Sequence, residues 1–403
     1  MRPLETTGGL AAFERRGPGT DAERRAARWL AGELIAQRHR VRVETFWCRP
    51  NWAMAHAWHV ALALVGSLLS PSHPTLGAIL LAIALGSVVM DEITGNSPGR
   101  RLTPERASQN VVAGTSNDSA EATATKTPLI VTANYDAGRT ALVYRDALRR
   151  PTAYLRRVAG RSAPGWLGWI SIAILWLLAV AIVRASAHHA PAALGAIQLV
   201  PTVALVLALA LLLEAAAAPY GPAANDNATG TAVALAVLDA LSPSTPPNVH
   251  LELVLAGAGE GGGIGIRRHL RGRRRELRRA NAIVLGIAPS GAGELHYWRS
   301  DGRLIPLGYG RALRELAAAI QKPRAQSGRG ETPAFAGRAL GLPAIAIGRL
   351  DERGVAPRSH QPTDLNTAID ETALENTTQF ALVLVDAINA SLAAAQEPSP
   401  TPA

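Results

Sequence analysis

Four long uncharged runs constrain the fold of this 403-residue chain more than any other feature. They are Trp52–Leu69, Thr75–Met90, Trp166–Val183 and Ala192–Leu213. A helix needs about 20 apolar residues to cross a bilayer, and about 17 at the least, so three runs are long enough and the second is marginal. We therefore expect two transmembrane helical hairpins, at residues 52–90 and 166–213. Buried helices of a water-soluble core are the alternative, but four such runs in two close pairs are hard to fit into one core.

The arginines beside these runs lie almost entirely on one side of the expected membrane. Within about 20 residues of the span ends, the N-terminal segment and the segment between the hairpins carry many arginines. These are Arg38, Arg40, Arg42, Arg49, Arg100, Arg101, Arg106, Arg149, Arg150, Arg156, Arg157 and Arg161. The connections inside the two hairpins carry only Arg184. Because arginine-rich segments stay on the cytoplasmic side, we expect a multi-pass protein of the cell membrane with both termini and all polar segments in the cytoplasm.

The polar remainder forms three segments, 1–51, 91–165 and 214–396, followed by a Pro-rich tail at 397–403 that we expect to be disordered. Short apolar runs in these segments predict strands at Val41–Trp47, Asn110–Gly114, Pro128–Ala133, His250–Leu255, Ala282–Ile287 and Ala344–Gly348. Helical spacing predicts helices at Asp21–Arg38, Ala228–Leu241, Ile264–Arg279, Arg311–Ile320 and Glu371–Ala394. Strands that alternate with helices predict one α/β domain with a mostly parallel central sheet and helices on both faces. The single cysteine, Cys48, excludes a disulfide framework within the chain.

Four polar loops follow apolar runs, at the positions where open α/β sheets usually place their sites. They are Ala133–Asp136, Gly221–Gly230, Gly257–Gly265 and Ser359–Asp364. The third loop contains Gly-x-Gly-x-x-Gly, which also occurs in dinucleotide-binding proteins. The acidic residue that those proteins carry after the next strand is absent, because Ala282–Ile287 is followed by Ala288 and Pro289. Nucleotide binding is therefore disfavoured.

In this order the four loops resemble those of the co-catalytic-zinc aminopeptidase family, peptidase family M28. The most specific element is the Gly-Ala-Asp-Asp-Asn-Ala-Ser-Gly type of motif, which is matched at 223–230 apart from Ala223, Asn225 and Thr229. A His-x-Pro-x-Asp element at 360–364 closes the pattern. The resemblance covers the polar segments and implies the zinc-aminopeptidase fold, interrupted by the two hairpins as insertions.

The resemblance also implies which positions would hold metal. The family binds two zinc ions, and the three positions around one of them are kept here as Asp226, Glu260 and His360. The two further ligands of the other zinc fall on Asn134 and Gly286, which cannot replace an imidazole or a carboxylate. The general base of the family falls on Gly259. Asp136 and Asp364 are kept as structural or vestigial residues. The expected site thus holds at most one zinc ion and no catalytic base.

Arg267–Arg279 carries eight arginines in 13 residues, with Glu276 as its only acid. Such a run is usually a solvated helix face. The expected membrane offers an anionic partner in its cytoplasmic leaflet, so lipid contact is the second interpretation. We expect no nucleic acid.

We therefore expect a membrane protein with a zinc-aminopeptidase-like domain that is catalytically degenerate and serves binding or assembly. The alternative is a membrane-bound metallopeptidase that works with a single zinc. A transporter is disfavoured, because His56 and His59 are almost the only ionisable residues in the runs, and we expect them at the membrane interface. The pattern identifies no peptide or protein partner.

Overall fold

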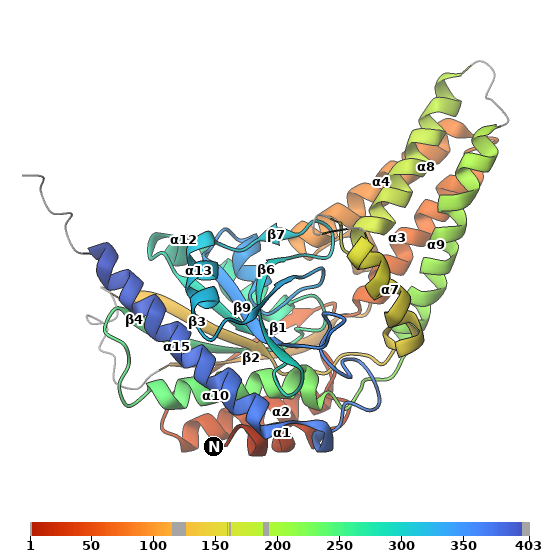
Figure 1. The fold of residues 1–403 in the computed structure, drawn as a ribbon. Helices are drawn as coiled ribbons and strands as arrows, with labels where there is room; N and C mark the ends of the chain where they lie inside the picture. The colour runs from red at the N-terminus through yellow and green to blue at the C-terminus, as the bar shows by residue number, and fades with distance from the viewer. Residues whose placement is uncertain (1, 115–125, 159, 161–162, 188–192, 397–403) are drawn as a thin grey trace, which may run out of the picture.

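The computed structural model describes all residues except 1, 115–125, 159, 161–162, 188–192 and 397–403, so the predicted disordered tail lies outside the described residues. Figure 1 shows an α/β body from which a bundle of long helices projects.

The bundle consists of α3 (Trp52–Leu69), α4 (Pro74–Thr94), α8 (Trp166–Ser186) and α9 (Ala193–Ala217). All four are long and apolar enough to cross a membrane. Their facing sides pack into one apolar core, while large apolar side chains such as Ile79, Leu175 and Leu207 remain exposed on the outside. Such an outer surface is typical of helices that contact lipid.

A fifth helix, α15 (Glu371–Gln396), has a similar length and apolarity over Glu371–Ala395. It lies on the α/β body, where Leu374, Phe380 and Leu384 are buried in the core together with residues of α10 (Gly230–Leu241). Burial of one face against the α/β body accounts for its apolar residues.

The body contains a single mixed sheet with the strand order β1-β2-β4-β3-β5-β9-β6-β7, and β8 pairs with β6. The strands are β1 (Arg40–Cys48), β2 (Arg106–Gly114), β3 (Thr127–Asn134), β4 (Val249–Ala256), β5 (Ile283–Ile287), β6 (Glu294–Asp301), β7 (Leu307–Gly308), β8 (Arg324–Ser327) and β9 (Ala344–Leu350). The α/β class is confirmed, but the sheet is not mostly parallel. The central strands β4, β3, β5 and β9 run parallel to one another, whereas β2 pairs antiparallel with β1 and β4, and β6 pairs antiparallel with β9 and β7.

The first hairpin explains one antiparallel edge. The chain leaves β1 at Cys48, passes through α3, α4 and the short helix α5 (Pro98–Arg101), and enters β2 opposite the point where it left, with Cys48 paired to Arg106. A hairpin that returns the chain to the same end favours antiparallel pairing, whereas a crossover helix on one face favours parallel pairing.

Helices cover both faces of the sheet, as predicted. One face packs against α1 (Pro3–Ala11), α2 (Asp21–Ala36), α10, α13 (Arg311–Ala319) and α15. The other packs against α11 (Ile264–Gly272), α12 (Arg274–Arg279) and α14 (Phe335–Ala339). The helix expected at Ile264–Arg279 is divided at Arg273, directly after Gly272, a weak helix former. The remaining elements are η1 (Leu142–Tyr144), α7 (Asp146–Val158), η2 (Ala224–Thr229) and η3 (Asn366–Ala368).

Buried polar groups join the foot of the bundle to the body. His56 and His59 do not face lipid at an interface but are buried beside Asp91, whose carboxylate accepts two hydrogen bonds of 2.8 Å from Arg100. Arg100 also donates to the carbonyl of Arg49. Buried charged groups are tolerated when they pair with one another and with backbone groups.

Candidate functional site

Three of the predicted ligands meet at the carboxyl ends of the central strands. Asp226 lies in η2 ahead of α10, Glu260 follows β4, and His360 follows β9. The His360 Nε2 atom lies 3.4 Å from Glu260 Oε2 and 3.7 Å from Asp226 Oδ2. Residues that are far apart in the sequence thus place two carboxylates beside one imidazole.

Two buried aspartates position the loops that carry these groups. The Asp364 carboxylate accepts the backbone N–H groups of Asn225 and Asp226, at 2.7 and 3.0 Å. The Asp136 carboxylate accepts those of Gly259 and Glu260, both at 2.9 Å. Each aspartate satisfies two buried donors, so Asp136 and Asp364 act on the site through the backbone.

Side chains that the sequence pattern did not single out hold the three groups in orientation. The Asn227 amide donates to Glu260 Oε1 at 2.9 Å, and the Ser359 hydroxyl donates to Asp226 Oδ2 at 2.5 Å. His360 Nδ1 lies 3.1 Å from the carbonyl oxygen of Arg139. A carbonyl can only accept, so Nδ1 carries the proton of a neutral His360 and leaves the lone pair of Nε2 facing the carboxylates.

Tyr144 covers the imidazole of His360, and Arg149 bonds the residue before it. The Tyr144 ring is stacked on the His360 ring with centroids 4.2 Å apart, and the two rings are 14° from parallel. Arg149 donates to the carbonyl oxygen of Ser359, and the Gln361 amide donates to the carbonyl oxygen of Tyr144. Tyr144 and Arg149 both belong to the segment of η1 and α7 that leads into the second hairpin. No sequence motif marks either residue.

The site is strongly acidic and buried. Burial, together with the nearby Asp226 and Asp136 carboxylates, raises the pKa of Glu260 well above its usual value. Burial also raises the pKa of Asp136 to about 6 and that of Asp364 to about 7, and it lowers the pKa of His360.

A buried arginine stands behind these carboxylates. Arg16 donates to the carbonyl oxygens of Tyr135, Pro222 and Ala223 at 2.8, 2.8 and 2.5 Å, and burial lowers its pKa to about 10. Its charge favours the ionised forms of the surrounding acids. No local signal in the sequence identifies Arg16, because its partners lie more than 100 residues away.

Residues 212–385 match the family model of Peptidase family M28. The chain resembles peptidase family M28. The aminopeptidase from Aneurinibacillus sp. strain AM-1 superposes with a TM-score of 0.56 at 13% identity, over 96% of this chain and 92% of that one. BSAP, a zinc aminopeptidase from Bacillus subtilis, superposes with a TM-score of 0.55 at 14% sequence identity, over 95% of this chain and 93% of that one. A glutaminyl cyclase from Bacteroides thetaiotaomicron superposes with a TM-score of 0.50 at 11% sequence identity, over 95% of this chain and 96% of that one. A search of curated proteins gives no match.

Asn134 and Gly259, the positions that the resemblance assigns to a ligand and to the base, lie against each other. A Cβ atom on Gly259 would lie 2.1 Å from Cγ of Asn134, so the Asn134 side chain occupies the space into which a side chain at 259 would point. The Asn134 amide oxygen is buried and has no hydrogen-bond partner among the residues that the structure describes. The cavity that these two residues help to line has a volume of about 10 Å³, room for about one water.

Gly286 lies inside β5, level with Thr132 of β3 and therefore two residues below the level of Asn134. A Cβ atom there would lie 2.3 Å from the backbone nitrogen of Ala334. The position therefore has no room for a side chain, and the structure does not bring it to the other site residues.

Proposed function

We propose that this chain is a membrane-anchored protein whose M28-like domain binds a ligand at the site of Asp226, Glu260 and His360 without efficient hydrolysis. The contact between Asn134 and Gly259 carries this proposal. The position that the family resemblance assigns to the base has no side chain, and the space beside it is filled. A general base commonly contributes about 10²–10⁴-fold to the rate, so its loss is severe.

We further propose that the site binds one zinc ion. Two ligand atoms about 2.1 Å from a tetrahedral zinc lie roughly 3.4 Å apart, close to the separations of His360 Nε2 from the two carboxylates. Among the described residues, no group of three or more His, Cys, Asp or Glu side chains could hold a metal as it stands, so binding requires a small rotation of these side chains. When bound, zinc supplies Lewis-acid polarisation to a ligand oxygen.

For the membrane, we propose that α3, α4, α8 and α9 span the bilayer with the α/β body in the cytoplasm. Their apolar outer surface and the arginine asymmetry support this placement. Arg271 donates to the carbonyl oxygen of Thr94 at 2.9 Å, so the arginine run at 267–279 reaches the end of α4. Its exposed members, such as Arg268 and Arg275, are proposed to contact anionic lipid.

Reporter fusions test the placement. A reporter that is active only outside the cytoplasm is fused to Ala403 in one protein and inserted between α8 and α9 in another. We expect activity only from the second. Activity at Ala403 without activity at the insertion contradicts the proposed orientation.

Hydrolysis assays on the unaltered protein test the proposed loss of activity. The protein is purified in detergent, supplied with zinc and offered a broad panel of aminoacyl and peptidyl substrates. We expect no chelator-sensitive turnover. Glu260→Ala is the matched site variant, and Glu315→Ala, on an exposed face of α13, is the control.

The same assay also tests the alternative function, a hydrolase that works with a single zinc. One histidine with two carboxylates is an ordinary catalytic zinc set, which favours this second candidate. Turnover that chelation abolishes, that Glu260→Ala abolishes and that Glu315→Ala keeps would establish the hydrolase and refute the binding protein.

A further inference from the structure

Helix α7 exposes three large apolar side chains and buries Arg149 and Ala153 against the protein. Leu148, Tyr154 and Val158 are 38%, 68% and 69% exposed, whereas Arg149 and Ala153 are both 7% exposed. Successive helical residues are rotated by about 100°, which places the three exposed apolar residues on one face and Arg149 and Ala153 on the opposite face. In a soluble domain the apolar face is the one that turns inward.

The position of α7 in the chain explains what can cover this face. Only residues 159–165 separate its end from Trp166, the first residue of α8. Figure 1 shows α7 at the foot of the bundle. The outer surface of the bundle carries exposed apolar side chains down to this end, including Trp169 of α8 and Leu213 of α9. The apolar face of α7 therefore continues the apolar surface of the bundle.

The charges on α7 fit an anionic surface. Arg145, directly before the helix, and Arg150 are exposed, and Asp146 is held by an ion pair of 2.9 Å with Arg353. An exposed apolar stripe flanked by arginines is the pattern of helices that lie in the plane of a membrane.

We propose that α7 lies along the cytoplasmic surface of the bilayer, with Leu148, Tyr154 and Val158 inserted between anionic lipid headgroups. This inference rests on the proposed membrane placement of the four long helices. It assigns α7 a lipid partner, beside the spanning helices and the arginine run at 267–279.

The helix also connects this lipid surface to the candidate site. Tyr144, two residues ahead of α7, stacks on His360, and the buried Arg149 donates to the carbonyl oxygen of Ser359. The residue that covers the imidazole is therefore attached to the element that contacts lipid.

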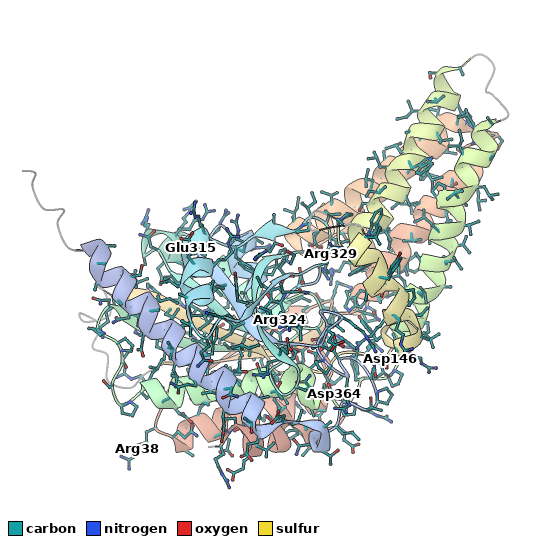
Figure 2. All side chains as sticks on the ribbon, viewed as in Figure 1. Arg38, Asp146, Glu315, Arg324, Arg329 and Asp364 are labelled. Atoms are coloured by element: carbon teal, nitrogen blue, oxygen red, sulfur yellow. The ribbon has the colours of Figure 1, made fainter. Side chains whose placement is uncertain are left out.

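Spin labels at three positions test the proposal in lipid nanodiscs. Tyr154→Cys probes α7, Leu207→Cys probes the exposed apolar face of α9, and Glu315→Cys probes an exposed face of the body far from the bundle (Figure 2). The native Cys48 is buried in β1 and burial raises its pKa to about 12, so it stays unlabelled near pH 7. Depth is measured from the relative access of oxygen and of a water-soluble nickel chelate.

We expect the Tyr154 label at a depth of about 5–10 Å in the boundary between headgroups and acyl chains. The Leu207 label should lie deeper, and the Glu315 label should be open to the chelate. A Leu207 label open to the chelate would overturn the spanning helices and the α7 proposal together. If the Leu207 label is deep but the Tyr154 label is as accessible to the chelate as the Glu315 label, the α7 proposal alone is overturned. A label at Leu148→Cys provides a second measurement of the same face.

The lipid composition tests the role of the arginines. In nanodiscs with phosphatidylglycerol the Tyr154 label should be deeper than in nanodiscs of phosphatidylcholine alone, because basic residues are attracted to an anionic surface. Arg150→Glu should reduce this difference. An equal depth in both lipids contradicts the proposed contact with anionic headgroups.

Discussion

The Cγ atom of Asn134 lies 2.1 Å from the point where a Cβ atom of residue 259 would stand. Asn134 ends β3 and Gly259 follows β4, and these neighbouring parallel strands bring the two residues together. The residue types at the two positions are therefore coupled by packing. A catalytic side chain at 259 requires a different residue, or a different rotamer, at 134.

The first prediction is that Gly259→Ala destabilises the protein, and that Asn134→Ala in the same chain relieves most of this loss. Overpacking of a buried site costs about 1–3 kcal/mol, and contacting residues show non-additive effects. Thermal unfolding of the two single variants and the double variant measures the coupling.

Gly330→Ala is the matched control for this cycle, because a Cβ atom at 330 would meet nothing within 4 Å. It should leave the unfolding temperature nearly unchanged. Additive effects of Gly259→Ala and Asn134→Ala would contradict the packing argument.

The second prediction concerns metal. Dialysed protein should contain at most one zinc per chain, because Asn134 offers only an amide and Gly286 has no room for a side chain. His360→Ala should weaken zinc binding strongly, since it removes the only imidazole of the set. Binding should also fall at low pH, where the ligands become protonated.

Metal analysis by mass spectrometry provides the measurement, and His73→Ala, at an exposed histidine ahead of α4, provides the control. Two zinc ions per chain would show that the positions assigned to the lost ligands are wrong.

The third prediction concerns the joint between bundle and body. Arg303 lies 2.9 Å from Glu92 of α4 and 3.2 Å from Glu331, and all three side chains are buried. Arg303→Met leaves two buried carboxylates with a weaker set of partners and should cost about 3–5 kcal/mol of stability. Adding Glu92→Gln should recover part of the loss, because it removes one of the uncompensated charges.

The exposed ion pair of Arg311 and Glu315, at 2.6 Å, provides a comparison. Arg311→Met should leave the stability nearly unchanged, because water solvates both charges. Equal losses from Arg303→Met and Arg311→Met would contradict a structural role of the buried joint.

The sequence predicts the helices and strands that local patterns specify. It does not predict the features that depend on contacts between distant parts of the chain. The uncharged run Trp52–Leu69 coincides with α3, and the apolar run His250–Leu255 lies within β4. The antiparallel direction of β2 depends on where the first hairpin returns the chain, and residue types alone do not reveal this. The division of the helix at Arg273 was missed because the run of arginines continues through it.

The same limit applies to the site. The resemblance places Asp226, Glu260 and His360 together, and the structure brings them to one point. Tyr144 over His360 and Arg16 behind the carboxylates are long-range contacts of residues outside any motif, so no sequence signal identifies them. A family motif identifies the positions of the site residues. The side chains that pack against those residues are identified only from the structure.

The fourth prediction concerns pH. Asp301 at the end of β6 is buried, accepts the N–H groups of Gly302 and Thr332 at 3.1 and 2.6 Å, and has its pKa raised by burial from 3.8 to about 7. Between these values the folded protein keeps a proton that the unfolded chain has lost. The contribution of Asp301 to stability is therefore greatest at the acidic end of this window and is lost as the pH rises to 7, with a slope of at most about 1.4 kcal/mol per pH unit.

Asp301→Asn removes the titration but keeps the shape. The variant loses one of two acceptor oxygens at every pH, so its constant cost cancels when two pH values are compared. Thermal unfolding of both proteins at pH 5 and pH 8 in one detergent should show the variant gaining stability relative to the parent as the pH rises. A relative stability that is unchanged, or that moves in the opposite direction, means that folded Asp301 is already ionised at pH 5 and that its two hydrogen bonds outweigh its burial.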